Sequence, residues 1–316
     1  MLCSVVIPLY NKGPYIEAAL ASLLAQTHAG WEAIVVDDGS TDDGAQRVRA
    51  CHDARVRLVS QANGGVSRAR NRGIAEARGE LVCFLDADDW YAPAYLQTQV
   101  AMAQAYAQDS FFATGFRGFT PGSDSNAALA DAAATPDQAE LVDDFFARRS
   151  RHWPFFCTNS VAVRRPALLA LQPCFPEGEP FGEDQDLWFR LAERHRLVLT
   201  QTALVAYRLE VGGSLSAISG RDVVLPVFAR LEQRARAWPA SQPARRHALL
   251  LVSNARVVVA RELLEAGRRG AALAELARAT RNGVTRHWWS TAAMCLLFTP
   301  GMTRRWTLWR KSRIAA

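Results

Sequence analysis

A short apolar run that stops at three carboxylates restricts most strongly how this chain can fold. Residues 81–85, Leu-Val-Cys-Phe-Leu, suit a buried strand of a parallel sheet. Three aspartates follow directly: Asp86, Asp88 and Asp89. Burying carboxylates at a strand end without a partner costs several kcal/mol, so we expect a cation beside them. A divalent metal that joins aspartate oxygens to a diphosphate fits this position, and the alternative is a solvated acidic turn that caps the next helix.

Strand and helix patterns alternate along residues 4–90. Each strand pattern is a short apolar run, and each helix pattern spaces its apolar residues three or four apart. Such alternation predicts a parallel sheet joined by right-handed crossovers. The expected strands are residues 4–9, 33–36, 55–60 and 81–85, and the expected helices are residues 16–25 and 66–78, the second closed by Gly79.

A second acidic pair, Asp37 and Asp38, follows the strand at residues 33–36, before Gly and Ser/Thr residues that suit a turn into a helix. Because parallel strands end at the same edge of a sheet, both acidic clusters should meet in the crevice where open α/β sheets bind ligands. The first strand is not followed by Gly-x-Gly-x-x-Gly, and the chain has no Gly-Lys-Ser/Thr loop. These absences argue against dinucleotide binding and P-loop NTPase chemistry.

The middle of the chain has weaker patterns. Residues 120–139 are rich in Gly, Ser, Asp and Ala, which fits either a surface loop or a flap over the site. The further elements that we expect are a helix at residues 93–106 and strands at residues 111–119, 156–163 and within 198–209.

The charge of the chain is concentrated near its end. The net charge is +6, and residues 240–316 hold 14 Arg or Lys against 3 Glu. Such a basic region predicts contact with an anionic surface. Residues 302–314 interleave tryptophans with arginines, which favours an anionic membrane interface over a terminal helix that docks its tryptophans on the protein itself. No nucleic-acid-binding motif accompanies the charge, so we expect no nucleic acid partner.

The cysteines and the ends of the chain indicate the compartment. Six cysteines are scattered without a C-x-x-C pair, which favours buried free thiols in a reducing compartment over disulfides or a zinc site. No basic segment precedes the first strand, so we expect no signal peptide. No apolar run approaches the roughly 20 residues that a spanning helix needs.

Five motifs in sequence order resemble those of the inverting family 2 glycosyltransferases, which have the GT-A fold. The resemblance covers the stretch from Ser4 to Trp90. The residues that carry it are 6–11 (Val-Ile-Pro-Leu-Tyr-Asn), 22–27 (Ser-Leu-Leu-Ala-Gln-Thr), 35–42 (Val-Val-Asp-Asp-Gly-Ser-Thr-Asp), 63–73 (Asn-Gly-Gly-Val-Ser-Arg-Ala-Arg-Asn-Arg-Gly) and 84–90 (Phe-Leu-Asp-Ala-Asp-Asp-Trp).

The resemblance implies a nucleotide-sugar donor and a divalent metal, Mn²⁺ or Mg²⁺. It implies that Asp38 hydrogen-bonds the base, that Asp86 lies near the ribose and that Asp88 coordinates the metal. A solvated charge on a helix face is the alternative for Arg70. The implied donor-binding set is Pro8, Tyr10, Asn11, Asp38, Arg70, Asn71, Asp86, Ala87 and Asp88.

A third acidic group lies at residues 183–186, at the start of an amphipathic helix pattern. Taken alone, these carboxylates are explained by the helix dipole, which favours negative charge at an N-terminus by typically about 0.3–1 kcal/mol. The resemblance instead implies that Asp184 is the general base that deprotonates the acceptor hydroxyl, with Glu183 as the alternative base or an orienting neighbour. A positioned carboxylate supplies roughly 10²–10⁴-fold by proton transfer.

One position departs from the family pattern. The family often has a His shortly after the Tyr-Arg pair at residues 207–208, where this chain has Glu210. In the family this His can contact the metal or the diphosphate, so Glu210 either replaces it in that role or is structural. Ser214 and Ser216 either reach the diphosphate or belong to a simple turn.

We therefore predict an α/β protein of the GT-A fold, with a mostly parallel sheet flanked by helices. Residues 1–218 would form the catalytic domain, with a donor half of about 1–115 and an acceptor half of about 116–218, and residues 219–316 a helical extension. The predicted activity is inverting, metal-dependent transfer from a nucleotide sugar, with UDP favoured, to a glycan or lipid-linked acceptor in cell-surface polysaccharide or lipopolysaccharide synthesis. The predicted location is cytoplasmic, peripheral on the inner face of the membrane.

Two other classes of protein remain as alternatives. One is a nucleotidyltransferase, which would carry a Gly-rich basic loop after the first strand, and residues 10–14 match such a loop poorly. The other is a non-catalytic nucleotide- or carbohydrate-binding protein, against which the three acidic groups argue.

Overall fold

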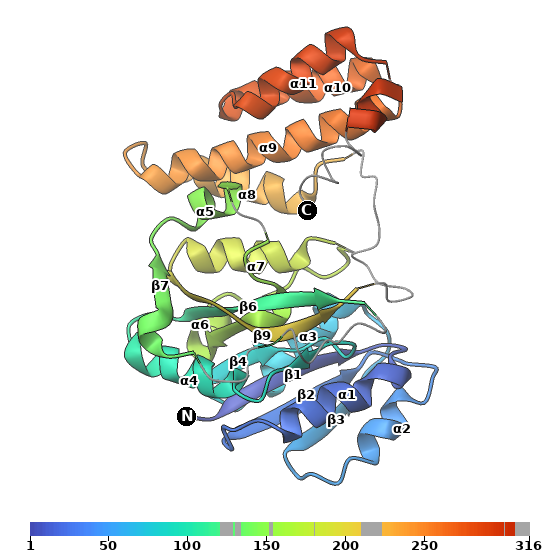
Figure 1. The fold of residues 1–316 in the computed structure, drawn as a ribbon, viewed down its shortest axis with the longest axis vertical. Coiled ribbons are helices and arrows are strands. Elements are labelled where there is room, and N and C mark those ends of the chain that lie inside the picture. The colour runs from blue at the N-terminus through green and yellow to red at the C-terminus, as the bar shows by residue number, and fades with distance from the viewer. Residues whose placement is uncertain are drawn as a thin grey trace. The chain divides into compact units, whose positions relative to one another are not determined.

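The computed structural model describes residues 1–120, 129, 134–151, 154–179, 181–209, 223–299 and 301–306. The chain divides into two compact units (Figure 1). One unit comprises residues 1–145 and 152–217 and carries the sheet, and the other comprises residues 146–151 and 218–316 and is helical.

Four parallel strands form the amino-terminal half of the sheet. The elements are β1 (Cys3–Leu9), α1 (Gly13–Leu24), β2 (Trp31–Asp37), α2 (Gly44–Arg49), β3 (Val56–Ser60), α3 (Val66–Glu76) and β4 (Leu81–Phe84). The strand order is β3-β2-β1-β4, and every pair is parallel. All residues of β2 and nearly all of β1 are buried, as expected for strands covered on both faces. The predicted alternation is confirmed here.

Beyond β4 the sheet becomes mixed. The elements are β5 (Trp90–Tyr91), α4 (Tyr95–Ala105), β6 (Phe111–Phe119), η2 (Pro136–Gln138), β7 (Ala139–Val142), α5 (Phe145–Arg151), η3 (Thr158–Ser160), β8 (Val161–Arg164), α6 (Arg165–Leu169), α7 (Glu183–Ala192) and β9 (Leu197–Arg208). Strand β8 runs antiparallel between β4 and β6, and β6 pairs with β9 in parallel. Strands β5 and β7 pair antiparallel with β9.

Two local predictions were wrong. Helix α3 ends at Glu76 instead of Arg78, and Gly79 does not cap it, because the chain is already extended at Ala77. Gly79 is needed for close approach, since a Cβ there would lie 2.7 Å from the Leu2 carbonyl oxygen. The strand expected at 156–163 begins only at Val161, because residues 158–160 form a 3₁₀ turn in which the Ser160 hydroxyl accepts from the backbone N–H of Cys157.

Helix α3 packs closely on the sheet through a glycine. A Cβ at Gly73 would lie 2.2 Å from the Cγ1 of Val6 in β1, so only a residue without a side chain fits. The contact presses the helix against the strand and fixes where the helix side chains point. Arg70, one turn earlier in the same helix, is buried.

Helix α7 is anchored to the sheet by aromatic rings. Trp188 stacks on Phe111 with ring centroids 5.7 Å apart and an interplanar angle of 13°. It also contacts Phe84 and Phe175 edge to face. Aromatic contacts of this kind are worth about 0.5–1.5 kcal/mol each beyond the apolar area that they bury. The anchored helix begins at Glu183, so the packing fixes the position of its acidic first turn.

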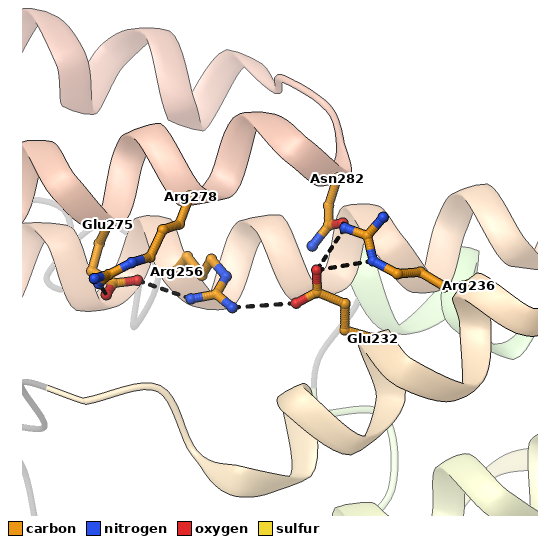
Figure 2. Close-up of polar contacts among 6 residues, drawn as sticks. All are labelled: Glu232, Arg236, Arg256, Glu275, Arg278 and Asn282. Carbon is orange, nitrogen blue, oxygen red and sulfur yellow. Dashed lines mark hydrogen bonds and ion pairs between the residues drawn. The ribbon is translucent and has the colours of Figure 1, made fainter.

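The helical unit is held together by an ion-pair network as well as by an apolar core. Its elements include α8 (Pro226–Ala237), α9 (Pro243–Glu265), α10 (Arg269–Ala279), η5 (Thr280–Asn282) and α11 (Arg286–Leu297). Arg256 of α9 lies between Glu232 of α8, at 3.2 Å, and Glu275 of α10, at 3.1 Å (Figure 2). Arg236 and Arg278 each pair with one of these carboxylates, and Arg236 also donates to Asn282.

The six cysteines are all free, and four of them are buried. Among the residues that the structure describes, none of the helices is sufficiently long and apolar to cross a membrane.

Candidate functional site

A cavity of about 680 Å³ opens at the carboxyl ends of β1, β2 and β4. Residues of α3, β6, η3, α7, the end of β9 and the adjoining loops also line it. Ten of the residues singled out from the sequence line it: Pro8, Tyr10, Asp38, Arg70, Asp86, Ala87, Asp88, Asp89, Glu183 and Asp184. The three acidic groups, which are up to about a hundred and fifty residues apart in the chain, therefore meet in one place, as parallel strands with a shared edge require.

Asp38 is buried and held by a loop. Its carboxylate accepts hydrogen bonds from the side chain of Gln61 at 2.8 Å and from the backbone N–H groups of Gly64 and Gly65 at 3.0 and 2.7 Å. Gly65 has a φ of 86°, a conformation that favours glycine. The loop after β3 therefore fixes the carboxylate at the cavity edge.

Arg70 links two of the acidic groups. Its guanidinium donates to Asp86 at 2.8 Å and to Glu183 at 2.9 Å, and its own side chain is 6% exposed. Burial acts to lower the pKa of Arg70, but the two carboxylates raise it on balance, so the charge is retained. Burial also raises the pKa of Glu183, and Asp184 beside it adds to this, while Arg70 opposes both. Arg70 is therefore a buried bridge between the turn after β4 and α7, instead of a solvated charge.

Asp184 is positioned by a residue that the sequence did not indicate. The hydroxyl of Thr158 donates to its Oδ2 at 3.0 Å, and the backbone N–H of Gln185 donates to its Oδ1 at 2.7 Å. Thr158 belongs to the 3₁₀ turn that replaces the start of the expected strand. Asp184 and Glu183 thus differ in their hydrogen-bond partners. Glu183 accepts from the charged guanidinium of Arg70, whereas Asp184 accepts from a neutral hydroxyl and a backbone N–H.

Asp89 is the most buried member of the acidic cluster after β4, with 2% of its surface exposed. Its two oxygens accept from the side chain of Asn159 and from the backbone N–H of Arg208, the latter at 2.6 Å. Burial raises the pKa of Asp89 well above its ordinary value, and the charges of Asp86 and Asp88 add to this effect. Asp89 therefore joins the turn after β4 to η3 and β9 at the wall of the cavity.

Asp88 faces the cavity and pairs with a lysine. The ammonium Nζ of Lys12, at the residue before α1, lies 2.8 Å from Asp88 Oδ2. Arg208 approaches the same aspartate from β9, but its Nε donates to the backbone carbonyl at 3.0 Å. The Arg208 guanidinium lies among aromatic rings, 4.9 Å from the ring centroid of Tyr15.

Asn11 and Asn71 lie outside the cavity lining. Asn11 has a φ of 51°, which Asn tolerates better than most residues, and its Oδ1 accepts from the backbone N–H of Thr41 at 2.8 Å. Asn71 exchanges two hydrogen bonds with the backbone of Phe175, at 2.8 and 2.9 Å. Both asparagines hold loops around the site.

The residues at Asp88 fit a divalent metal that is shared with a phosphate ligand. In the described part of the chain no three His, Cys, Asp or Glu side chains converge as a metal-binding group. Asp88 nevertheless presents a carboxylate to the cavity, and the Lys12 ammonium shows that a cation fits against it. Mg²⁺ is usually held in nucleotide enzymes by one or two carboxylates together with substrate phosphates. Asp88 would be the ligand from the protein.

Comparison with known proteins identifies the family. The chain matches the profile of glycosyl transferase family 2 over residues 4–165. It belongs to this family. It is 32% identical over 214 residues to an uncharacterized glycosyltransferase, alr2836, of Nostoc sp., a match that covers 66% of this chain and 65% of the relative. It is 45% identical over 98 residues to the uncharacterized glycosyltransferase EpsJ of Bacillus subtilis, covering 30% and 28% of the two chains. The chain thus spans less than two thirds of the length of these relatives.

Solved structures show the same GT-A fold. The structure of S. aureus TarS 1-349 in complex with UDP-GlcNAc superposes with a TM-score of 0.67 at 18% identity, covering 95% of this chain and 93% of TarS. The mannosyltransferase PcManGT of Pyrobaculum calidifontis, in complex with GDP-Man and Mn²⁺, superposes with a TM-score of 0.54 at 21% identity, covering 97% and 83%. At these identities the likeness establishes the fold.

Some sequence-based predictions fall on residues that the structure does not describe. These are the roles of Glu210, Ser214 and Ser216, most of the segment 120–139 and the basic segment from residue 307 onward. The residues that sequence reasoning missed are Lys12, Gln61, Thr158, Asn159 and Arg208. Arg208 belongs to the Tyr-Arg pair at residues 207–208, and Lys12 lies next to the motif at residues 6–11. The contact of Lys12 with Asp88 spans 76 positions, so spacing alone gave no signal.

Proposed function

We propose that this family 2 glycosyltransferase transfers a sugar with inversion from a nucleoside-diphosphate sugar, with UDP as the favoured nucleotide, to a hydroxyl of a glycan or lipid-linked acceptor. The observation that carries the proposal is the shared cavity of Asp38, Asp88 and Asp184. The neighbours' bound UDP-GlcNAc and GDP-Man support a nucleotide-sugar donor. We further propose residues 1–218 as the catalytic domain and 219–316 as an extension.

The residues divide the reaction between them. Asp38, with Pro8 and Tyr10, would hold the base, and the Arg70–Asp86 pair would lie toward the ribose. Asp184 takes the proton from the acceptor hydroxyl while the oxygen of that hydroxyl forms a bond to the anomeric carbon. The bond from that carbon to the diphosphate oxygen breaks in the same step, and the electron pair leaves with the nucleoside diphosphate. A divalent metal bound at Asp88 would supply charge neutralisation for this leaving group.

Asp184 is preferred to Glu183 as the base because of their partners. Glu183 is 11% exposed and its Oε1 accepts from Arg70, so a proton taken there would weaken a buried ion pair. Asp184 lines the same cavity and is held by the neutral hydroxyl of Thr158.

The test is release of nucleoside diphosphate across a panel of nucleotide sugars with Mn²⁺ or EDTA, with thermal-shift binding measured in parallel. We expect a nucleotide-sugar donor to bind wild type, and to do so only when the metal is present. Asp88→Ala should lose that binding, and Asp184→Asn should bind the donor with turnover lowered roughly 10²–10⁴-fold. Asp137→Asn, on the exposed 3₁₀ turn η2, is the matched control. A wild type that no nucleotide sugar stabilises under any metal condition contradicts the proposal and favours a non-catalytic binding protein. Release of sugar 1-phosphate in place of nucleoside diphosphate favours a nucleotidyltransferase, because attack on the phosphorus next to the nucleoside expels the sugar with its phosphate.

We propose peripheral contact with an anionic membrane on its cytoplasmic face, which suits an acceptor used in cell-surface polysaccharide or lipopolysaccharide synthesis. Supporting side chains on α11 are Trp289, Leu296 and Leu297, which are 67%, 73% and 74% exposed. Trp306 behaves differently, because it lies 5.1 Å from the Arg261 guanidinium and packs on the helical core. Co-sedimentation with anionic vesicles, but not with neutral ones, is the expected result, and binding unchanged in Trp289→Ser would contradict this role for α11.

A further inference from the structure

The ion pair between Lys12 and Asp88 sits where the proposed metal would bind. Nζ and Oδ2 are 2.8 Å apart, and the two side chains are 18% and 16% exposed. Both residues line the cavity. The pair therefore keeps the Asp88 carboxylate matched by a positive charge inside a partly enclosed site, where an unmatched carboxylate would be costly.

The chemistry of the cation at this place is unusual for the chain. Of its 37 basic residues only Lys12 and Lys311 are lysines, and the rest are arginines. An ammonium is a compact charge on a flexible stem with three rotatable donors, whereas a guanidinium is a rigid fork. Lys12 can therefore change partners by rotating its side chain.

Arg208 provides the contrast within the same cavity. Its Nε is bonded to the Asp88 carbonyl oxygen, and its guanidinium lies 4.8–5.3 Å from the ring centroids of Tyr15, Trp90 and Phe119. It is thus fixed in place by its surroundings. The two cations next to Asp88 differ in freedom, since Lys12 contacts a carboxylate at the cavity and one ring at 5.8 Å.

We propose that Lys12 is an exchangeable counter-ion of Asp88. In the free protein it pairs with the Asp88 carboxylate. When a metal–nucleoside diphosphate binds, Asp88 would coordinate the divalent cation and Lys12 would pair with the diphosphate instead. The inference rests on the proposed function, in which Asp88 is the metal ligand. An ammonium and a divalent cation repel each other strongly when they share one carboxylate. A divalent metal that bound at Asp88 without a nucleotide would displace Lys12 and leave it without an anionic partner. If the metal bound together with a diphosphate, Asp88 would pair with the metal and Lys12 with the diphosphate.

The consequence is coupling between metal and nucleotide. Each ligand should raise the affinity of the other, by the same factor in both directions. Lys12→Met removes the competitor for Asp88, so metal alone should bind about tenfold more tightly, and the coupling factor should fall by a similar amount. Lys12→Arg keeps the charge and should keep the coupling in part. Arg49→Met, an exposed charge at the end of α2, is the control and should change neither quantity.

The experiment observes Lys12 directly. Lysine labelled with ¹⁵N and ¹³C gives two side-chain signals in this protein, and the Lys311→Arg variant identifies the one from Lys12. Signals would be recorded for the free protein, with Mg²⁺ alone, with UDP alone and with both, while calorimetry measures Mg²⁺ and UDP binding to wild type and the variants. We expect the Lys12 signal to be shifted by the ion pair in the free protein, to lose that shift in Asp88→Asn and to move to a third position with Mg²⁺ and UDP together.

The outcomes separate this inference from the proposed function. If Mg²⁺ and UDP bind together while the Lys12 signal stays unchanged, or if Lys12→Met retains the full coupling, the exchange is wrong and the proposed donor site stands. If wild type binds neither UDP nor other nucleotides with any metal, the donor site and the exchange both fail.

Discussion

Arg70 donates to Glu183 at 2.9 Å across 113 positions of the sequence, and this contact joins helix α3 to helix α7 at the cavity. The same guanidinium also pairs with Asp86, so one cation neutralises two carboxylates, one from the turn after β4 and one from α7. A buried ion pair is not by itself a large net source of stability, but removing one partner leaves uncompensated charge.

Arg70→Met should therefore lower the free energy of unfolding by about 3–5 kcal/mol, because both carboxylates lose their common partner. Urea denaturation measures this value. Arg49→Met removes an exposed arginine from α2 and should stay within about 0.5 kcal/mol of wild type. A loss below about 1 kcal/mol in Arg70→Met would show that the carboxylates find other partners.

Thr158→Val should reduce turnover without weakening donor binding. The substitution keeps the shape of the side chain and removes the hydroxyl that donates to Asp184 Oδ2 at 3.0 Å. A less firmly held base should lower kcat by about tenfold while KM for the donor changes little. Steady-state kinetics separate the two parameters, with Thr135→Val at an exposed position as the control. Equal losses in kcat and donor affinity would indicate that Thr158 contacts the donor instead.

Asp89 should make stability depend on pH. Burial raises the pKa of Asp89 in the folded protein. Its contribution to the free energy of unfolding is therefore fully present below its pKa in the unfolded chain, about 3.9. That contribution is lost as the pH rises toward its pKa in the folded protein. The free energy of unfolding of wild type should fall relative to that of Asp89→Asn as pH increases, with a limiting slope of about 1.4 kcal/mol per pH unit. Urea titrations between about pH 4 and 7 measure both slopes, and parallel curves would mean that Asp89 is ionised in both states.

Two glycine-to-alanine substitutions should act in opposite directions. Gly73→Ala places a methyl group 2.2 Å from Val6 Cγ1 and should cost about 1–3 kcal/mol of stability. Gly270→Ala, in α10, meets nothing within 4 Å and should stabilise by about 0.4–1 kcal/mol. Thermal unfolding of the two variants ranks them. Recovery of Gly73→Ala by a second change, Val6→Ala, would confirm that the clash is the cause.

Most of the sheet and the meeting of the acidic groups could be predicted from the sequence, because hydrophobic period and strand direction are local signals. Residues 81–85 indicated a buried strand, and β4 is fully buried there. The direction of β8 could not be predicted in this way. Its pairing depends on how the chain returns after β6, and the 3₁₀ turn before it depends on hydrogen bonds of Ser160.

The site was predicted in outline, and its internal pairing was not. Asp184 was singled out as the base, while Thr158, which holds it, stands in a segment that was expected to be a strand. Lys12 lies next to the family-like residues 6–11, yet nothing in the spacing connects it to Asp88. Side-chain partners of this kind follow from three-dimensional packing, which composition and periodicity do not encode. The assignment of catalytic and metal-binding roles stays a prediction.

The composition of the helical unit affects how this protein can be cut. The unit takes residues 146–151 from the middle of the chain, and Phe146, 1% exposed, packs against Trp238 with ring centroids 5.6 Å apart. A fragment that stops after residue 217 would keep Phe146 and lose its covering ring. The helical unit expressed alone would lack the same short segment. The two units therefore cannot be separated by a single cleavage, and a swap between relatives would need to exchange two stretches of sequence together.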